Sequence, residues 1–451
     1  MIYKLRDYQQ QASDKAVSFF QSNTKKNAIM VLPTGCHAKG TKILMSDGSL
    51  KNVEDIIVGD KLIGPDGKDR NVLELHQGID DMYEIQPIKG DKFVVNGGHI
   101  LSLYKTNEGR DYPSCKPNIH EISVREYIQS SKYYKHLHKL YRPPLIEFDN
   151  SDSELSVDPY FLGIYLGDGS SSNGSISITT QRKEVESFIL EYTRELGLSN
   201  RICEKSDCNK ALTFFINGDG RKNKNILILK LKKLRLFKCT SGDKFIPIQY
   251  LTSTKDNRLS LLAGLLDTDA FYDGTSFEYC TKSKKLADDI VYLCRSLGFS
   301  ANIGKNKIIK GICYYRMQIN GALDTIPTKV GIRQASPRKQ KKNVRVTGFS
   351  VKLLGCGEYY GFTLDKDHLY CDSQFFVHHN SGKSLIIADI ANRLTGYTLV
   401  FQPSKEILEQ NYKKLCSYGV FDCSIYSASF NSKQISRITF ATIGSVKGHP
   451  E

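Results

Sequence analysis

Two segments far apart in the chain carry the residue types of a phosphate-binding loop. Residues 27–35 read NAIMVLPTG, an apolar strand-like run that meets a Pro-Thr-Gly turn, and residues 381–384 read SGKS and lead into the helix-like run LIIADIANRL. In such a loop, backbone N–H groups and a helix N-terminus cradle phosphates, the lysine reaches the β- and γ-phosphates, and the serine hydroxyl binds Mg²⁺. The candidate residues for binding ATP and Mg²⁺ are Gly35, Ser381, Gly382, Lys383 and Ser384.

Joining the two segments restores one continuous motif. Gly35 placed directly before Ser381 gives LPTGSGKSLIIADI, which reads as a strand, a small-residue turn, Gly-Lys-Ser and a helix. The joined sequence departs from G-x-x-x-x-G-K-S at its first position, where Leu32 stands for glycine. Because the halves rejoin in frame, residues 36–380 are interpreted as an insertion inside a phosphate loop.

The sequences on both sides of the insertion belong together. LRDYQQQASDKAV before it, and YTLVFQPSKEILEQNYKKL and RITFATIGSVKG after it, resemble the segments around the phosphate loop of superfamily 2 helicases. The resemblance covers residues 1–35 and 381–451 and stops before any Asp-Glu motif. It implies a partial α/β, RecA-like host domain that binds ATP, Mg²⁺ and nucleic acid once its halves are joined.

The ends of the insertion resemble a known class of self-excising element. It begins CHAKGTKILMSDGSLKNVEDIIVGDKLIGPDG and ends EYYGFTLDKDHLYCDSQFFVHHN, followed by Ser381. Both stretches closely resemble the terminal blocks of inteins. The resemblance implies that residues 36–380 are excised and that Gly35 is ligated to Ser381, with no cofactor for splicing.

Cys36 provides the first nucleophile of that reaction. A thiol is intrinsically the best side-chain nucleophile at neutral pH, and Gly35 leaves the attacked carbonyl unhindered. In inteins a Thr-x-x-His segment polarises the carbonyl and protonates the leaving nitrogen. Here that segment reads NGGH, so His99 matches the family and Asn96 replaces threonine, although an amide can also donate a hydrogen bond.

The other end carries the residues for the later steps. The resemblance implies that the Ser381 hydroxyl takes over the acyl group and that Asn380 then cyclises and cuts the chain. His379 matches the residue that protonates the leaving amide, and His368 matches a further family histidine that activates Asn380.

These residues have other interpretations. A single buried cysteine or histidine is more often structural. Cysteine after glycine at one border and His-Asn-Ser at the other, both inside one phosphate loop, favour splicing. A Hedgehog-type autoprocessing module needs no terminal asparagine and is disfavoured. The alternative function is an ATPase domain with a permanent DNA-binding insertion that does not splice.

The splicing residues require a fold that brings both ends of the insertion together. The short runs KILM, KLIG, MYEIQPI, KFVVNGG and ILSLYK alternate in polarity and are broken by turn residues, which predicts strands. We expect a compact all-β domain of the Hedgehog/intein-like class, in which Cys36 and Ser381 lie close together.

An internal repeat lies in the middle of the insertion. Residues 161–169 read FLGIYLGDG and residues 262–270 read LAGLLDTDA, and both resemble the LAGLIDADG helix of homing endonucleases, with acids at Asp168 and Asp269. A threonine and then a Leu-Gly pair follow each acid at equal distances, which indicates an α+β duplication with a pseudo-two-fold axis.

The resemblance implies a DNA-cleaving centre where the two helices end. Asp168 and Asp269 would meet there and hold Mg²⁺, which takes oxygen ligands and phosphate. Lys244, in DKFIP, matches the family's basic residue, whereas the second repeat has Asp324 at that point, so a single lysine is assigned. The expected partner is double-stranded DNA of the host gene without the insertion. The alternative is a decayed domain in which these acids are turn residues.

Composition agrees with a DNA-binding protein of the cytoplasm. A net charge of +15 attracts DNA, although a solvated surface explains it equally well, as it does the basic stretch 332–346. No apolar run reaches the roughly 18 residues of a membrane helix, and no signal peptide is evident. The twelve cysteines form no CxxC pair and are expected as free thiols. We expect a monomer.

The domain organisation follows from these motifs. The expected segments are a host segment 1–35, the first part of the splicing domain 36–148, the endonuclease 149–335, the second part of the splicing domain 336–380 and a host segment 381–451.

Overall fold

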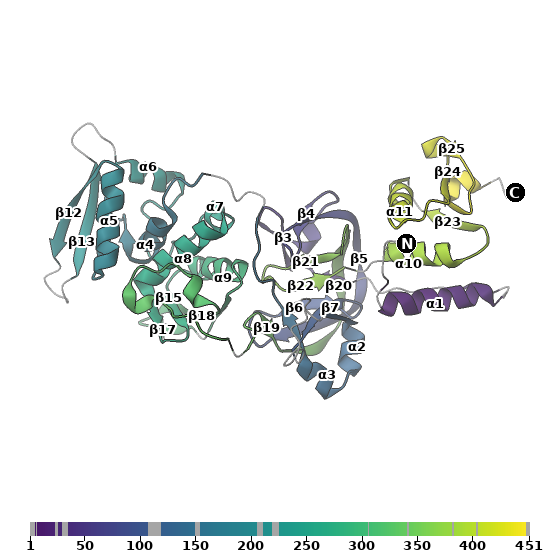
Figure 1. The fold of residues 1–451 in the computed structure, drawn as a ribbon, viewed down its shortest axis with the longest axis horizontal. Helices are drawn as coiled ribbons and strands as arrows, with labels where there is room; N and C mark the ends of the chain where they lie inside the picture. The colour runs from purple at the N-terminus through teal and green to yellow at the C-terminus, as the bar shows by residue number, and fades with distance from the viewer. Residues whose placement is uncertain are drawn as a thin grey trace. The chain divides into compact units, whose positions relative to one another are not determined.

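A computed structural model shows that the chain folds into two compact units (Figure 1). One unit is Gly35–Asn380, and the other combines Met1–Thr34 with Ser381–Glu451. None of the helices in the described ranges is long and apolar enough to cross a membrane. The structure describes residues 5, 7–22, 26–28, 35–106, 119–148, 154–204, 211–218, 225–304, 306–340, 342–380, 383–402 and 405–447.

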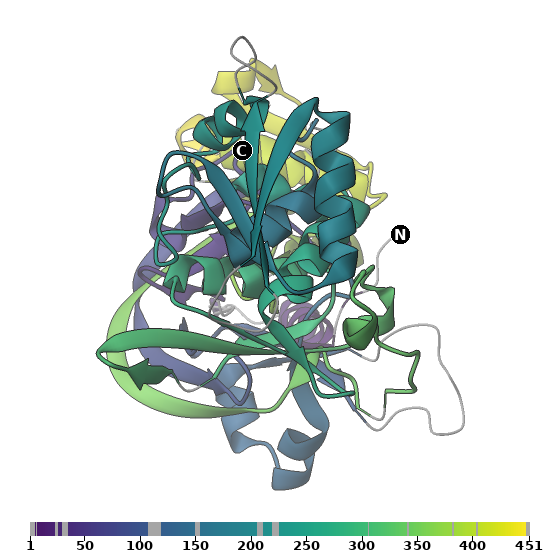
Figure 2. The same cartoon turned by 90° about the vertical axis from the view of Figure 1, so that its left-hand side faces the viewer.

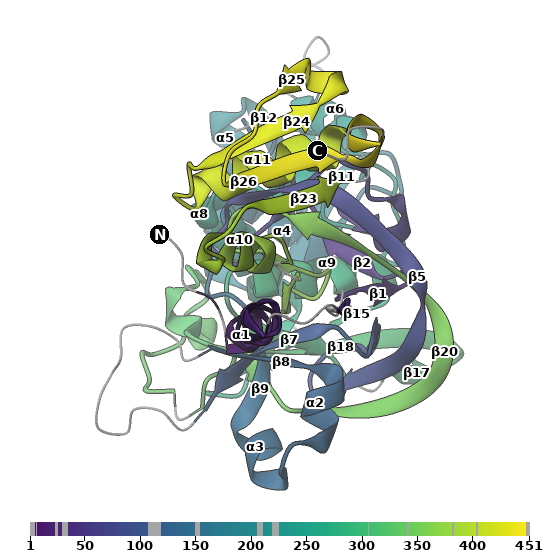
Figure 3. The ribbon, with the colours of Figure 1, turned by 90° about the vertical axis from the view of Figure 1, so that its right-hand side faces the viewer.

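The unit formed by the two flanks has an α/β fold. Its sheet has the order β23-β26-β24-β25, in which β23, β26 and β24 run parallel and β25 is antiparallel to β24 (Figure 3). Leu408, Leu415, Ile438 and Phe440 form its buried core. Its elements are α1 (Asp7–Gln21), α10 (Lys383–Arg393), β23 (Thr398–Gln402), α11 (Lys405–Ser417), β24 (Cys423–Ser427), η4 (Ala428–Phe430), β25 (Ser432–Lys433), β26 (Ile438–Thr442) and α12 (Ile443–Val446).

Helix α1, from before the insertion, packs on α10, from after it. The Ser13 hydroxyl donates to Asp389 Oδ2 at 2.5 Å, and both side chains are buried. Arg393 Nη1 lies 2.7 Å from Asp14 Oδ1 at the edge of the same contact. The two flanks therefore form one domain although the insertion separates them in sequence.

The predicted splicing part of the other unit, residues 36–148 and 336–380, is built mainly of strands. Alternating residues such as Phe93 and Val95 of β6 point into the core, as the period-two pattern predicts. Two short helices occur in addition, and α2 begins with a capping box of Ser123 and Glu126. The elements are β1 (His37–Ala38), β2 (Lys42–Leu44), β3 (Leu50–Asn52), η1 (Val53–Asp55), β4 (Lys61–Ile63), β5 (Asp69–Pro87), β6 (Phe93–Asn96), β7 (Ile100–Lys105), β8 (Ile119–Ser123), α2 (Val124–Gln129), α3 (Lys132–Leu137), β9 (His138–Tyr141), β19 (Val346–Thr347), β20 (Phe349–Leu364), β21 (Leu369–Cys371) and β22 (Val377–His379).

A long two-stranded ribbon connects the beginning and the end of the splicing part. β5 and β20 pair antiparallel from Phe349 opposite Pro87 to Leu364 opposite Val72, with register shifts near both ends of β20 (Figure 3). β1 lies between β20 and β6, and β22 pairs with β7. The first and last strands of the insertion are therefore both tied to the β6–β7 segment.

The predicted endonuclease part, residues 149–335, contains the same arrangement twice. Each half has a helix that ends in an acid, a short strand, a second strand and a helix that covers the sheet. In the first half the covering helix is α5, which lies beside the teal strands in Figure 2. The sheets have the orders β10-β11-β13-β12 and β14-β15-β18-β16, with β17 paired to β18. The first half has α4 (Pro159–Asp168), β10 (Gly169–Ser170), β11 (Ile176–Thr180), α5 (Lys183–Glu195), β12 (Leu198–Glu204), β13 (Leu212–Gly218) and α6 (Ile226–Lys233). The second has α7 (Ile248–Leu251), α8 (Lys255–Asp269), β14 (Ala270–Tyr272), β15 (Phe277–Thr281), α9 (Lys284–Ser296), β16 (Ser300–Ile303), β17 (Lys307–Ile309), β18 (Ile312–Asn320), η2 (Leu323–Thr325) and η3 (Gly331–Arg333).

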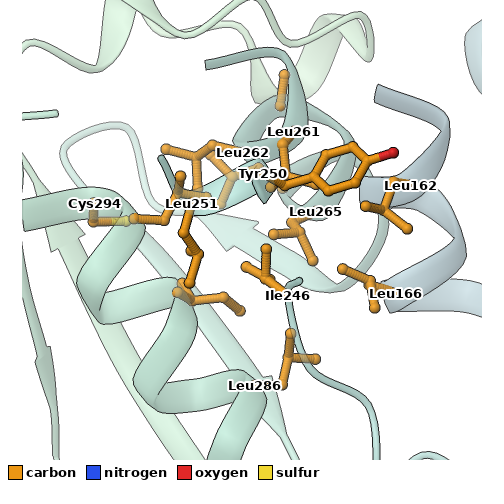
Figure 4. Close-up of a cluster of buried hydrophobic side chains, with 14 of the residues drawn as sticks. Leu162, Leu166, Ile246, Tyr250, Leu251, Leu261, Leu262, Leu265, Leu286 and Cys294 are labelled. Atoms are coloured by element: carbon orange, nitrogen blue, oxygen red, sulfur yellow. The ribbon is translucent and has the colours of Figure 1, made fainter. Parts of the chain in front are cut away.

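Both halves share one hydrophobic core. Leucines of α4 and α8 face each other and the α7 segment, as Figure 4 shows for Leu162, Leu166 and Leu265. Such helices are buried on most of their surface, which explains their continuous apolar sequence. The repeat recognised in the sequence is thus a repeat of structure.

Candidate active sites

Cys36 directly precedes β1 and is fully buried. The next residue, His37, pairs with Tyr360 of β20 on one side and with Val95 of β6 on the other. Gly361 leaves room for the thiol, because a Cβ there would lie 2.5 Å from Cys36 Sγ. The predicted nucleophile is therefore held against two strands and is shielded from water.

Asn96 contacts the backbone of Cys36 through two hydrogen bonds. The Cys36 N–H donates to Asn96 Oδ1 and the Asn96 N–H donates to Cys36 O, each at 3.1 Å. Asn96 Nδ2 donates to Asp80 Oδ2 at 3.2 Å, and Asp80 also pairs with Arg125. The amide oxygen therefore holds the N–H of the bond to be broken, while the amide donor expected on the carbonyl side is directed to Asp80.

The two ends of the insertion meet at Gly35. A Cβ on Gly35 would lie 3.3 Å from the Cα of His99 and 3.4 Å from the carbonyl oxygen of His379. The pairing of β22 with β7 produces this approach, because it sets His379 opposite Ile100. The residue before the first nucleophile thus lies against the last residues of the insertion, as the all-β prediction required.

The last residues of the insertion are buried beside a turn. The Asn380 N–H donates to the carbonyl oxygen of His368 at 2.8 Å. The rings of His368 and His379 have centroids 6.1 Å apart, and all three side chains are more than nine-tenths buried. Ser381, the predicted second nucleophile, lies outside the described residues.

Two further histidines join His99 in a buried cluster. His99 Nε2 lies 3.0 Å from His378 Nδ1, within hydrogen-bond distance. The ring of His37 lies 4.9 Å from that of His99 and 4.8 Å from that of His378, and His37 Nε2 is 2.7 Å from the Tyr370 hydroxyl. His378 Nε2 lies 3.3 Å from Asp372 Oδ2. The family histidine is therefore the centre of a polar network.

Burial keeps His99 and His37 uncharged. It lowers the pKa of His99 well below its usual 6.5, and the charges of His37, His378 and His379 lower it further. Burial also lowers the pKa of His37, helped by the charge of His378. Sequence reasoning missed His37 and His378, although each is the immediate neighbour of a predicted residue in a strand. Neighbours in a strand point to opposite faces, so these two side chains make contacts that the predicted residues beside them do not make.

In the endonuclease part, α4 and α8 cross with their backbones in direct contact. A Cβ on Gly163 would lie 2.4 Å from the carbonyl oxygen of Leu261, and one on Gly264 would lie 2.2 Å from that of Tyr160. Such distances exclude any side chain, so these two glycines permit the helices to pack at this depth. The crossing carries the C-terminal ends of both helices, and with them the two acids, to one place.

The two acids face each other at those helix ends. Burial and the charge of Asp269 raise the pKa of Asp168 to about 7, whereas Lys244 lowers it. The residue Asp269 is exposed at the surface, but the protein around its carboxylate partly desolvates it and raises its pKa as well, again opposed by Lys244. The neighbouring Tyr279 is fully buried, and both carboxylates add to the effect of burial in raising its pKa. Two carboxylates whose ionised forms are disfavoured when they are held together form a site suited to a divalent cation, which takes oxygen ligands.

Lys244 caps helix α4 and faces the acids. Its Nζ donates to the carbonyl oxygens of Tyr165, Leu166 and Gly169 at 2.9, 2.9 and 2.7 Å. Burial lowers the pKa of Lys244 to about 8, and the charges of Asp269 and Asp168 oppose that shift. The lysine predicted for the first half therefore lies beside the carboxylates and fixes the end of the helix that carries Asp168.

Arg333 has the corresponding place in the second half. Its Nη2 donates to the carbonyl oxygen of Thr268 at 2.8 Å, next to Asp269, and its charge acts on Asp168 and Asp269. Arg333 is 8% exposed, so the interpretation of 332–346 as a solvated or phosphate-contacting linker is wrong for this residue. Asp324, at the position equivalent to Lys244, is exposed. Sequence reasoning missed Arg333 because it comes from a later turn than the repeat predicts.

The nucleotide-binding residues lie mostly outside the described part. Residues 29–34, Ser381 and Gly382 are not described, and for Lys383 and Ser384 only the backbone is. Helix α10 begins at Lys383, where the phosphate-loop prediction starts a helix. The ATP and Mg²⁺ prediction stays a prediction.

Two family models match parts of the chain. The Hom_end-associated Hint family matches residues 36–111, and the LAGLIDADG-like domain family matches residues 256–324. The first range contains Cys36, Asn96 and His99, and the second contains Asp269. These matches agree with the all-β and α+β architectures of the two parts.

Three curated proteins are similar to segments of the chain. The catalytic subunit of the V-type proton ATPase of Candida tropicalis is 41% identical over 87 residues, 17% of this chain and 8% of that protein. The replicative DNA helicase DnaB of Mycobacterium intracellulare is 23% identical over 269 residues, 56% of this chain and 41% of that protein. The homothallic switching endonuclease of Saccharomyces cerevisiae is 26% identical over 178 residues, 34% of this chain and 30% of that protein. The chain thus spans less than half the length of each.

Proposed function

We propose that residues 36–380 form an intein, a splicing domain with an inserted LAGLIDADG-type endonuclease, and that the chain excises this segment and joins Gly35 to Ser381. The observation that carries the proposal is the meeting of the two ends, with Gly35 packed against the carbonyl of His379. Protein splicing requires this closeness, whereas a permanent insertion does not require a nucleophile at one end and Asn380 at the other.

The first step forms a thioester at the first junction. The Cys36 thiol loses its proton and attacks the carbonyl carbon of Gly35, and the bond from that carbon to Cys36 N breaks as the nitrogen takes up a proton. Asn96 Oδ1 fixes the leaving N–H at 3.1 Å, and His99 lies against the same peptide. Burial of Cys36 excludes water that would hydrolyse the thioester.

The remaining steps move the acyl group and release the segment. The Ser381 hydroxyl attacks the thioester and releases the Cys36 thiol. Asn380 then cyclises through its side-chain nitrogen on its own carbonyl, with His379 donating a proton to the leaving amide of Ser381 and His368 activating the asparagine. An ester-to-amide shift leaves the peptide bond between Gly35 and Ser381. Because Cys36 must stay reduced, we place the reaction in the cytoplasm.

Intact-mass measurement tests this proposal. Wild-type chain, kept under reducing conditions at neutral pH, should yield a segment 36–380 and a ligated host. The double variant Cys36→Ala with Asn380→Ala should yield only full-length precursor. A wild-type chain that stays intact even after refolding would contradict the proposal.

We further propose that the inserted domain cleaves double-stranded DNA at the host gene's uninterrupted site. Asp168 and Asp269 would hold Mg²⁺, which fits the raised pKa of Asp168 beside a second carboxylate. A divalent ion bound there supplies activated water and stabilises charge on the scissile phosphate. Lys244 and Arg333 fix the helix ends and bring positive charge to the centre. A plasmid that carries the joined host sequence, incubated with protein and Mg²⁺, tests this; no cleavage across salt and metal conditions contradicts it.

For the flanking unit we propose a P-loop ATPase domain of a nucleic-acid helicase, active only after splicing and monomeric. The support is the parallel sheet and the packing of α1 on α10. Consecutive backbone N–H groups are needed to cradle phosphates, and the insertion interrupts them before Lys383. The unspliced double variant should therefore bind Mg-ATP far more weakly than ligated host in a nucleotide titration. Equal affinity would overturn this.

A further inference from the structure

We propose that Asp372 and His378 are positioning residues for the first splicing step, and that they set the tautomer of His99 so that its Nδ1 is free to accept the proton of Cys36. The inference rests on the proposed splicing function and deepens it. The resemblance to inteins assigned no role to either residue.

Asp372 is a fixed acceptor. Its Oδ1 accepts from the backbone N–H groups of Gln374 and Phe376, each at 2.8 Å, and the residue is 2% exposed. Its Oδ2 lies 3.3 Å from His378 Nε2. This second contact is a charge contact and not an aligned hydrogen bond. An acceptor oxygen facing one ring nitrogen favours the hydrogen on that nitrogen, so Nε2 of His378 carries it.

The preference then passes to His99. With its hydrogen on Nε2, His378 has a lone pair on Nδ1, and this lone pair accepts from His99 Nε2 at 3.0 Å. His99 is neutral, because burial lowers its pKa well below 6.5. With its hydrogen on Nε2, His99 presents a lone pair on Nδ1. That buried atom has no hydrogen-bond partner in the described part of the chain.

An unpaired buried acceptor costs free energy and needs a reason. The unpaired Nδ1 serves the first step, since the backbone of the same residue lies against Gly35, whose carbonyl Cys36 attacks. Nδ1 takes the thiol proton as the C–S bond forms, and returns it to Cys36 N as the C–N bond breaks. No proton is gained or lost overall. The opposite tautomer would present an N–H and could not start this sequence.

Asp372→Asn is the sharpest test. Its Oδ1 still accepts from the two backbone N–H groups, but an NH₂ donor replaces Oδ2 beside His378 Nε2. The donor reverses both tautomers, so thiol-induced cleavage at Gly35, measured in an Asn380→Ala chain between pH 6 and 9, should slow about 10²- to 10⁴-fold. Asp47→Asn, which alters a turn aspartate that accepts from Ser49, is the matched control.

A separate readout excludes a simple folding defect. Asp372→Asn placed in a Cys36→Ala chain should retain cleavage after Asn380 and the parent unfolding temperature. His378→Asn can offer Oδ1 in place of Nδ1 and should keep part of the first step, whereas His378→Leu should lose it. Adding Asp372→Asn to His378→Asn should cause no further loss.

Two results would overturn the inference. One is first-step cleavage at the parent rate in Asp372→Asn while wild type splices, and the other is equal slowing of both junctions. A wild-type chain that never splices would instead contradict the proposed function itself.

Discussion

The backbone N–H of Asn380 donates to the carbonyl oxygen of His368, and His368 itself has a left-handed backbone with φ of +63°. That region is uncommon for residues other than glycine, although asparagine, aspartate and histidine adopt it more often than the rest. Local strain of this kind persists where the surroundings hold it. The turn with His368 thus fixes the backbone of the residue whose side chain must cyclise.

This arrangement allows the His368 side chain to be tested apart from its backbone. His368→Gly keeps a left-handed backbone accessible and removes the imidazole. In a Cys36→Ala chain, cleavage after Asn380 should slow about 10²-fold, because a general acid–base group is lost. Rates from intact mass over time provide the measurement. Cleavage at the parent rate would show that His368 acts through its carbonyl alone.

The glycine crossing in the endonuclease should be intolerant of a single methyl group. Gly163→Ala or Gly264→Ala places Cβ within 2.4 Å of a backbone oxygen, which must push α4 and α8 apart. We expect a loss of about 1–3 kcal/mol in unfolding free energy and strongly reduced DNA cleavage. Gly242→Ala is the control, since the nearest atom to a Cβ there is 3.7 Å away. If chemical denaturation gave the same unfolding free energy for all three variants, the close packing of α4 on α8 at these glycines would be contradicted.

The raised pKa of Asp168 predicts how pH changes the stabilisation of the endonuclease by Mg²⁺. Burial and Asp269 raise the pKa of Asp168 to about 7, so without metal the folded state favours its protonated form at pH values below about 7. Its contribution to stability is full at pH values below the unfolded pKa of about 3.9 and is lost as pH rises through 7. A cation at the ionised pair reverses this loss. Mg²⁺ should therefore raise the melting temperature more at pH 8 than at pH 6.

Asp168→Asn provides the matching control for the pH measurement. It should abolish both the pH dependence of the Mg²⁺ shift and DNA cleavage, and leave splicing unchanged, because the splicing residues belong to other segments. A Mg²⁺ shift in Asp168→Asn equal to that of the wild type would place the cation elsewhere.

Lys244 and Arg333 should prove comparable in importance. Lys244→Met and Arg333→Met each leave carbonyl oxygens at a helix end without a donor and remove a positive charge beside the acids. We expect each to reduce cleavage of the target plasmid about 10- to 100-fold, in the range found when a partner of a metal-site carboxylate is removed. Lys284→Met, at an exposed salt bridge with Asp288, should cleave normally. Full activity of Arg333→Met would make Lys244 the sole basic contributor.

The sequence predicted the architecture well because its signals were local and repeated. The rejoined phosphate loop located the insertion ends, and the paired Asp168 and Asp269 indicated two equivalent helices. The polar network around His99 could not be predicted from the sequence, since Asp372 and His378 come together only through the pairing of β21 with β22. Arg333 was hidden for a similar reason, because a turn outside the repeat carries it to the second helix end.

The central claim is that the chain rejoins its own flanks, and one peptide reports on it directly. Tryptic digestion of the ligated host should release NAIMVLPTGSGK, which contains residues 27–35 bonded to residues 381–383. Tandem mass spectrometry of wild-type protein incubated with reductant should detect this peptide, and it should be absent from Cys36→Ala with Asn380→Ala. Digests of folded wild type that contain only the uninterrupted Gly35–Cys36 and Asn380–Ser381 bonds would contradict the account.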